Sequence, residues 1–156
     1  MKACVIFDTR YGNTEKVAKS LESGLKEAGI ETVCGNAREI AIDSLRQCDL
    51  ICIGAPTEQF TAYKPIKSFL QGLSKDLSGK FGFAFDTRID SRFSGSAASY
   101  IEKRLDSLGL TIIVPRESAF VFGPRPSKLV EGEEKRFETI GKEIGIALVN
   151  RAGIPA

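Results

Sequence analysis

The amino-acid sequence predicts an α/β fold in which helices cover both faces of a doubly wound, five-stranded parallel sheet. Short apolar runs alternate with segments whose apolar residues recur every three or four positions, as strands alternating with amphipathic helices do. Several of the runs contain no polar alternation, which is typical of strands that are buried on both faces. At roughly 30 residues per strand–helix unit, five units fill the 156 residues, so we expect residues 1–156 to form one domain.

The expected strands cover residues 3–7, 30–34, 50–54, 81–85 and 110–114, the last continuing through 119–122. Four apolar stripes mark the expected helices: Val17, Leu21, Leu25 and Ala28; Ile66, Phe69, Leu70 and Leu73; Ala97, Ile101, Leu105 and Leu108; Phe137, Ile140, Ile144 and Leu148. Residues 38–47 have a weaker pattern that predicts only a short helix. Strands and helices in this alternation are joined by right-handed crossovers, which make the sheet parallel.

The composition excludes several classes of function. The chain has no histidine, which excludes Ser-His-Asp and Cys-His catalysis and histidine-ligated metals, and we expect no metal site. With 22 basic and 20 acidic residues in no long run of like charge, a nucleic-acid partner is not expected. No apolar stretch could span a bilayer, so a membrane is not expected either. Four cysteines without a disulfide-framework pattern favour a cytoplasmic location.

Sheets of this type bind ligands beyond the carboxyl ends of their strands, which directs attention to the loops after residues 7, 54 and 85. The first loop contains Thr9, Gly12, Asn13 and Thr14 directly before a helix. Unpaired backbone N–H groups and the positive end of the helix dipole make such a loop a cradle for phosphate. The alternative is plain capping, with Asn13 as the N-cap and Gly12 as a turn residue.

The motif Thr9-Arg10-Tyr11-Gly12-Asn13-Thr14 resembles the flavodoxin phosphate loop, Ser/Thr-x-Thr-Gly-Asn-Thr/Ser, with Tyr11 where threonine is usual. This resemblance to the flavodoxin family implies a three-layer sandwich with strand order 2-1-3-4-5. It implies one non-covalently bound FMN, electron transfer and transient redox partner proteins. It further implies that Thr9, Gly12, Asn13 and Thr14 hold the phosphate, and that Arg10 and Tyr11 lend backbone N–H groups.

The second loop, residues 55–63, is similar to the first flavin-ring loop of the family. The resemblance implies that Pro56, Thr57 and Glu58 lie at the cofactor and that Phe60 or Tyr63 stacks on the ring. The alternative is that both aromatic side chains pack on the following helix. Many members carry a glycine here whose peptide group bonds the flavin, but residues 55–64 contain no glycine. Because other residues rarely adopt a positive φ, we do not expect that contact.

The third loop, residues 86–96, corresponds to the segment that contacts the flavin's pyrimidine edge in the family. The resemblance places Asp86, Thr87 and Arg88 at the ring and makes Phe93 the second aromatic. Phe93 could instead pack onto the helix that begins near Ser94, which Ser94 or Ser96 would cap.

Two further patterns resemble other chemistry. Cys4 and Arg10 have the Cys-x5-Arg spacing of tyrosine phosphatases, but Cys4 lies in the middle of an apolar strand, which predicts an inert core thiol. A phosphoryl-receiver domain needs acidic residues at the ends of the first and third strands, and Asp8 would stand alone.

The sequence therefore predicts an FMN-binding protein that acts in electron transfer. Two alternatives stay open: an FMN-dependent reductase that passes electrons from a nicotinamide to a quinone, a porphyrin precursor or a metal, and a flavin-free binding module. Electron carriers of the family are typically strongly acidic, whereas this chain carries a net charge of +2 with Arg10, Arg88 and Arg92 at the ligand edge. We therefore expect a less negative flavin potential than an acidic flavodoxin has.

Overall fold

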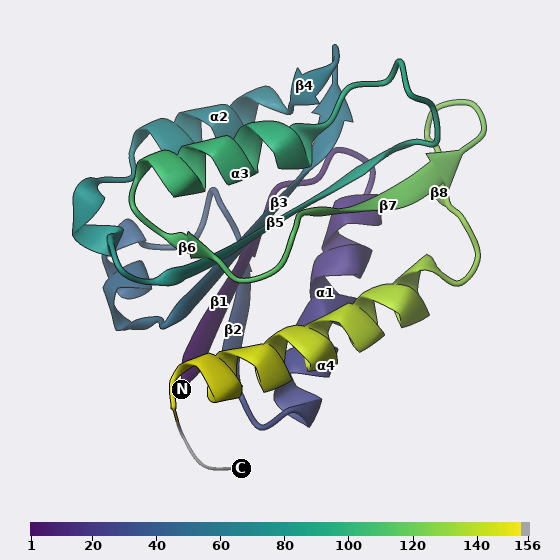
Figure 1. Ribbon diagram of the computed structural model, residues 1–156. Helices are drawn as coiled ribbons and strands as arrows, with labels where there is room; N and C mark the ends of the chain where they lie inside the picture. Colours follow the sequence, from purple (N-terminus) through teal and green to yellow (C-terminus); the bar gives the residue numbers. More distant parts are fainter. Residues whose placement is uncertain (154–156) are drawn as a thin grey trace.

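The computed structural model describes residues 1–153 as a central sheet between two layers of helices (Figure 1). The strands are β1 (Lys2–Phe7), β2 (Glu31–Asn36), β3 (Leu50–Glu58), β4 (Thr61–Ala62), β5 (Phe81–Ile89), β6 (Thr111–Ile112), β7 (Glu117–Phe122) and β8 (Lys128–Leu129). The helices are α1 (Asn13–Glu27), α2 (Lys64–Gln71), α3 (Ala97–Ser107) and α4 (Glu133–Arg151), with 3-10 turns η1 (Ile42–Gln47) and η2 (Lys75–Leu77). No described helix is long and apolar enough to cross a membrane.

The five long strands are parallel and lie in the order β2-β1-β3-β5-β7. When the long strands alone are numbered along the chain, β5 is the fourth and β7 the fifth. The predicted order 2-1-3-4-5 is therefore confirmed. Two short strands extend the sheet beyond the prediction: β4 pairs antiparallel with β3, and β8 pairs antiparallel with β7. Both antiparallel additions lie at the carboxyl edge of the sheet, where they shape the loops that the sequence singled out.

The fifth predicted strand is interrupted. Its first part, β6, runs beside the beginning of β5, and its second part, β7, runs beside the end of β5. Pro115 lies in the break between them, where it has no N–H to donate to a ladder. The short helix expected within residues 38–47 is the 3-10 turn η1.

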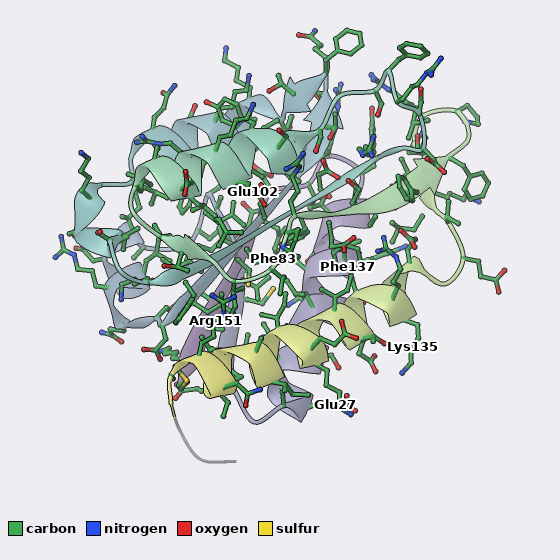
Figure 2. The ribbon with its side chains drawn as sticks, viewed as in Figure 1. Glu27, Phe83, Glu102, Lys135, Phe137 and Arg151 are labelled. Carbon is green, nitrogen blue, oxygen red and sulfur yellow. A yellow bond between two sulfur atoms is a disulfide. The ribbon has the colours of Figure 1, made fainter. Side chains whose placement is uncertain are left out.

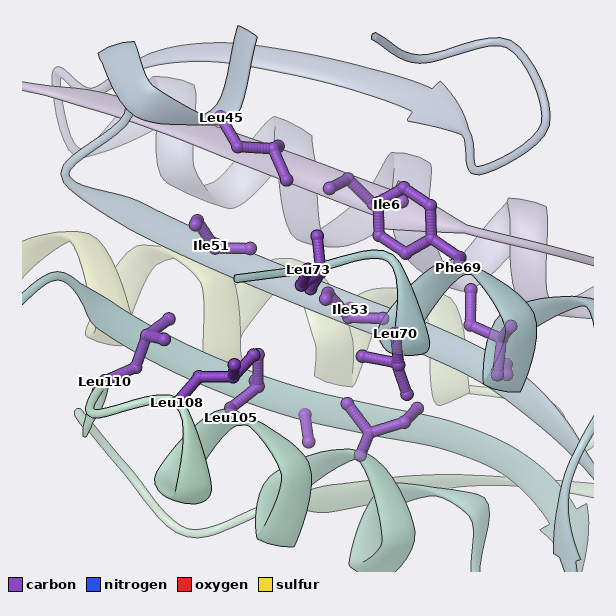
Figure 3. Packing of buried hydrophobic residues seen from close by; sticks show 14 of the residues in the cluster. Ile6, Leu45, Ile51, Ile53, Phe69, Leu70, Leu73, Leu105, Leu108 and Leu110 are labelled. Carbon is purple, nitrogen blue, oxygen red and sulfur yellow. The ribbon is translucent and has the colours of Figure 1, made fainter. Parts of the chain in front are cut away.

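Each face of the sheet has its own apolar core. Under α2 and α3 the core includes Ile6, Ile51 and Ile53 from the strands (Figure 3). Under α1 and α4 it includes Phe83 and Phe137, which lie between the sheet and α4 (Figure 2). Burial on both faces explains why the central strands are uninterrupted apolar runs.

Glycines allow α1 and α4 to pack with their backbones in close contact. A Cβ on Gly24 would overlap the carbonyl oxygen of Glu138, and a Cβ on Gly141 would overlap that of Leu21. A Cβ on Gly145 would overlap the side chain of Ala28, just after the end of α1. The close approach fixes how α1 lies on the sheet, and therefore where its first turn points.

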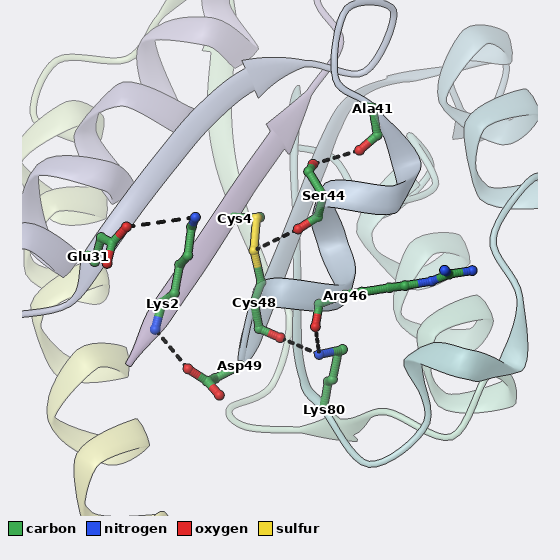
Figure 4. The surroundings of a disulfide bond; sticks show 9 residues. All are labelled: Lys2, Cys4, Glu31, Ala41, Ser44, Arg46, Cys48, Asp49 and Lys80. Atoms are coloured by element: carbon green, nitrogen blue, oxygen red, sulfur yellow. Dashed lines mark hydrogen bonds and ion pairs between the residues drawn. A yellow bond between two sulfur atoms is a disulfide. The ribbon is translucent and has the colours of Figure 1, made fainter.

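Cys4 and Cys48 form a disulfide, which corrects the expectation that Cys4 is a free core thiol (Figure 4). Both side chains are buried, and their Cα atoms are 6.1 Å apart although 44 residues separate them in sequence. Because β1 and the segment before β3 meet only in the fold, no local spacing reveals the pair. The bond removes one argument for a cytoplasmic location, since disulfides persist mainly in oxidising compartments. Burial raises the pKa of the free Cys34 thiol to about 11.

We expect Gly24→Ala to destabilise the protein, because the new methyl group separates α1 from α4. Overpacking of this kind costs about 1–3 kcal/mol, which exceeds the roughly 1 kcal/mol by which a helix interior favours alanine over glycine. Chemical denaturation followed by far-ultraviolet circular dichroism measures the change. The matched control is Ser23→Ala, at an exposed position of the same helix. Equal stability of the two variants would contradict the close packing.

Candidate functional site

A pocket opens at the carboxyl edge of the sheet, and we call it the edge pocket. Ten of the residues predicted for a cofactor site line it: Thr9, Arg10, Tyr11, Asn13, Thr14, Pro56, Thr57, Glu58, Thr87 and Arg88. Four lining residues were not predicted: Ile89, Val121, Arg125 and Ser127. The fold thus brings all three predicted loops together, and a fourth segment, between β7 and β8, joins them.

The first loop leaves the start of α1 without a side-chain cap. Gly12 occupies the N-cap position at φ 92°, and no side chain caps the helix. The Thr9 hydroxyl accepts a hydrogen bond from the Gly12 N–H at 2.9 Å, which closes the turn. Apart from Gly12 itself and the adjoining residues, no described atom lies within 4 Å of where a Gly12 Cβ would stand, so space remains over the first turn. A helix N-terminus with open space above it can hold an anion.

Asn13 does not cap the helix, which decides against the plain-capping alternative. Its side-chain amide donates to the carbonyl of Ser127 at 2.7 Å, across to the segment between β7 and β8. Thr14 is buried, and its hydroxyl lies 2.9 Å from that of Thr87 at the end of β5. These two bonds hold the start of α1 against the loops that follow β5 and β7.

Two ion pairs order the charges around the first loop. Arg10 bonds Glu58 of the second loop at 2.8 Å, and this carboxylate raises the pKa of Arg10. Asp8 is almost fully buried at the end of β1 and accepts hydrogen bonds from Arg38 at 2.9 Å and from the Thr9 N–H at 2.8 Å. The Asp8 carboxylate raises the pKa of Arg38. Both carboxylates are thus compensated by guanidinium groups.

The second loop is a tight hairpin between β3 and β4 whose two central residues have positive φ, 48° at Gln59 and 70° at Phe60. Both values belong to the left-handed region, which the two central residues of a type I′ hairpin turn must adopt. Glycine usually occupies at least one of these two positions. Two residues other than glycine thus adopt positive φ here, and the expected absence of the glycine-type contact with the flavin stays a prediction. The conformation costs on the order of 1–3 kcal/mol per residue, which the surroundings must offset.

Gly95 of the third loop supports that hairpin. Phe60 and Gly95 form an isolated parallel bridge, and Gly95 itself has φ 72°. A Cβ on Gly95 would overlap the Phe60 carbonyl. The second and third loops are therefore locked together, backbone against backbone.

The aromatic side chains separate into two groups. Tyr63 packs against the core under α2, as the alternative reading had it, and its hydroxyl lies 3.5 Å from an Arg38 nitrogen. Phe60 and Phe93 are 72% and 71% exposed, which contradicts the packing alternative for both. The Arg92 guanidinium lies 4.9 Å from the centre of the Phe93 ring. Two exposed phenylalanines thus stand on the loops beside the pocket.

Asp86, predicted to face a cofactor, lies beneath the start of α3 with none of its surface exposed. One carboxylate oxygen accepts hydrogen bonds from the Ala98 N–H at 2.9 Å, the Ser96 hydroxyl at 2.8 Å and the Thr57 hydroxyl at 3.2 Å. The other oxygen has no partner among the described residues. Asp86 therefore anchors the second loop and α3 to β5, while Ser96 caps α3 as one alternative expected.

The segment between β7 and β8 is the part that sequence reasoning missed. It contributes Arg125 and Ser127, and Ser127 holds Asn13. One signal was available, since the fifth predicted strand also ends at this edge with Phe122. Its Gly-Pro-Arg-Pro sequence, however, reads as an ordinary surface turn.

Comparisons with known proteins identify the family and agree with the fold. The family model described as flavodoxin matches residues 5–141. A flavodoxin of Clostridium saccharobutylicum is 33% identical over 89 residues, covering 56% of this chain and 56% of that protein. An archaeal flavodoxin structure superposes with a TM-score of 0.80 at 21% identity, covering 95% and 99% of the two chains. The flavodiiron protein of Giardia intestinalis gives 0.76 at 20% identity, covering 99% of this chain and 38% of that one. The chain spans 36–56% of the length of the curated relatives it matches.

We expect Gly95→Ala to unlock the second loop from the third and to cost about 1–3 kcal/mol more than a positive-φ alanine costs elsewhere. The matched control is Gly123→Ala, because Gly123 has φ 86° but no atom near a Cβ. Denaturation measures the stability, and amide hydrogen exchange over residues 57–62 reports the loop. Equal effects of the two substitutions would contradict the lock.

Proposed function

Because the chain belongs to the flavodoxin family, we propose that it binds FMN in the edge pocket and acts as an electron carrier. The observation that carries the proposal is the uncapped first turn of α1, with open space above Gly12, in a pocket that unites three flavin-type loops.

The phosphate fits the first loop. The first turn of α1 has no side-chain cap, and the positive end of the α1 dipole stabilises an anion in the open space above Gly12. Thr9 closes the turn and Asn13 holds it against Ser127, so the cradle is held in place before a ligand arrives. A preformed cradle lowers the ordering cost of binding.

The ring fits between the second and third loops. Pro56, Thr57, Thr87 and Arg88 line this part of the pocket, and Phe60 and Phe93 are free to cover a flat aromatic ligand. When bound, the flavin supplies the reversible uptake of one or two electrons, while the protein supplies orientation and electrostatics.

The charges favour a carrier over an enzyme that activates a second substrate. Glu58 is the one acidic residue among those that line the edge pocket, and its carboxylate is paired with Arg10. A general acid or base needs a group that is free to exchange a proton with substrate. The pocket offers no such carboxylate, which supports a site whose reactive atoms belong to the cofactor.

We expect the purified protein to take up FMN and to bind riboflavin, which lacks the phosphate, about 100-fold more weakly. Charge-assisted hydrogen bonds are worth roughly 1.5–3 kcal/mol each, and about 1.4 kcal/mol is a factor of ten in affinity. Quenching of flavin fluorescence during titration measures both affinities. A protein that takes up no FMN would instead be a flavin-free module, and bleaching of the bound flavin by added NADPH would favour the reductase.

Gly12→Ala should weaken FMN binding at least about tenfold, because its strained backbone disturbs the cradle. The matched control is Gly132→Ala, since Gly132 is the N-cap of α4 with φ 91° and equally open space. Both variants should lose similar stability, but only Gly12→Ala should lose FMN affinity. An equal loss of affinity in both would contradict the assigned phosphate site.

We expect Arg125→Gln to make the potential of the bound FMN more negative by an amount on the order of tens of millivolts. A nearby cation stabilises the reduced, more negative flavin, and its removal reverses this effect. A spectroelectrochemical titration measures the shift. Arg151→Gln, at the opposite end of the sheet (Figure 2), should leave the potential unchanged. A less negative potential in Arg125→Gln would contradict the assigned role of the cations.

A further inference from the structure

The positive charge of the chain is concentrated around the edge pocket. The four segments that surround it, residues 9–13, 56–63, 88–95 and 121–128, contain five cations, Arg10, Arg88, Arg92, Arg125 and Lys128. They contain two carboxylates, Glu58 and Asp90, so their net charge is +3, whereas the whole chain carries +2. The remainder of the molecule is therefore slightly acidic, and the charge marks one end of it.

Most of these cations lack a carboxylate partner. Among the ion pairs of residues 1–153, Arg10 is neutralised by Glu58, but Arg88, Arg92, Arg125 and Lys128 take part in none. Arg88 donates instead to the Ser118 hydroxyl at 2.9 Å and to the Ser91 carbonyl at 3.2 Å, which are neutral acceptors. Its charge stays uncompensated, as do those of the exposed cations.

Exposed apolar side chains lie among these cations. Ile89 is 57% exposed and Phe122 is 56% exposed. Both are the last residues of their strands, with Ile89 beside Val121 and Phe122 beside Lys128. Because Phe122 is the residue after Val121, its side chain points to the opposite face of the sheet from that of Ile89, and the two flank the end of the sheet. In Figure 1 the end of β5 and the β7–β8 hairpin lie at the same end of the molecule. Exposed apolar side chains on both sides of the end of the sheet, with cations among them, are the composition of a protein-binding surface that is rich in arginine.

We propose that Ile89, Arg92, Phe122, Arg125 and Lys128, the basic rim, form a docking surface for an acidic protein. The fitting partner spans the end of the sheet, so that its carboxylates meet Arg92, Arg125 and Lys128 while its apolar side chains meet Ile89 on one side and Phe122 on the other. A protein docked there lies beside the edge pocket, and in this respect the inference rests on the proposed function. Charges of opposite sign steer such encounters and accelerate association.

The same charges argue against a second copy of this chain. If two copies met through their basic rims, two regions that each carry a net charge of +3 would face each other. Glu58 and Asp90, the only carboxylates of these segments, are already included in that net charge. Like charges in contact cost free energy and slow association. An acidic partner removes this repulsion, so it is the occupant that the surface favours.

The test is nuclear magnetic resonance of the nitrogen-15-labelled protein, as purified and again after FMN is added. Three probes are titrated separately: an acidic oxidised ferredoxin, basic cytochrome c and a short DNA duplex. At low salt the ferredoxin should shift amide signals of residues 88–95 and 121–128. Raising the salt to about 0.3 M should weaken this binding at least about tenfold, because the Debye length shortens.

Variants sharpen the assignment. Arg92→Glu combined with Lys128→Glu should weaken ferredoxin binding at least about tenfold, and Phe122→Ala should weaken it about threefold or more. The control is Arg151→Glu, which makes the same charge change as Arg92→Glu but lies at the far end of the sheet. It should leave the affinity for ferredoxin unchanged.

Several results would overturn the proposal. One is that ferredoxin shifts amide signals outside residues 88–95 and 121–128. Another is that cytochrome c or DNA binds these segments as tightly as ferredoxin does. A third is that the signals of these segments move when the concentration of this protein alone is raised. Unchanged affinity in the double variant would also overturn it. Because the binding is measured with and without FMN, a failure of FMN uptake would disprove the proposed cofactor while leaving the docking result intact.

Discussion

The arrangement of this protein depends on the need to cover both faces of a parallel sheet. Each helix returns the chain to the start of the next strand, so every long strand ends at the same edge. Loops that are distant in sequence therefore meet there: Asn13 bonds Ser127, and Arg10 bonds Glu58. The close packing of α1 on α4 through Gly24 then fixes where the first turn of α1 points. The pocket is thus a consequence of packing far from it.

The loops at this edge are held by polar groups rather than by an apolar core. Buried Asp86 joins the end of β5 to Thr57 and to the start of α3, and Gly95 lies directly against the Phe60 carbonyl. A buried carboxylate with three donors is strongly favoured over one that has lost them. This support accounts for the left-handed conformation of Gln59 and Phe60, which neither residue favours by itself.

Periodicity predicted the five strands, and the strand-end rule pointed to the three loops. The resemblance to flavodoxins implied the strand order and, within those loops, ten of the fourteen residues that line the pocket. Features that arise only from tertiary contact were missed, because no local pattern encodes them. Ser127 bonds Asn13 although 114 residues separate them in sequence, and Cys4 bonds Cys48 over a sequence separation of 44. The hairpin at Gln59 and Phe60 was missed for another reason, since local preference argues against it and Gly95 overrides that preference.

The two ends of the described chain lie away from the pocket. β1 begins at Lys2, and α4, which runs opposite to the strands, finishes at Arg151 at the amino edge of the sheet (Figure 1). Additional polypeptide joined at either end would attach there, on the side remote from the basic rim. The fold can therefore be joined to other domains through either end: larger proteins that contain such a unit can tether it and still leave the edge pocket open to solution.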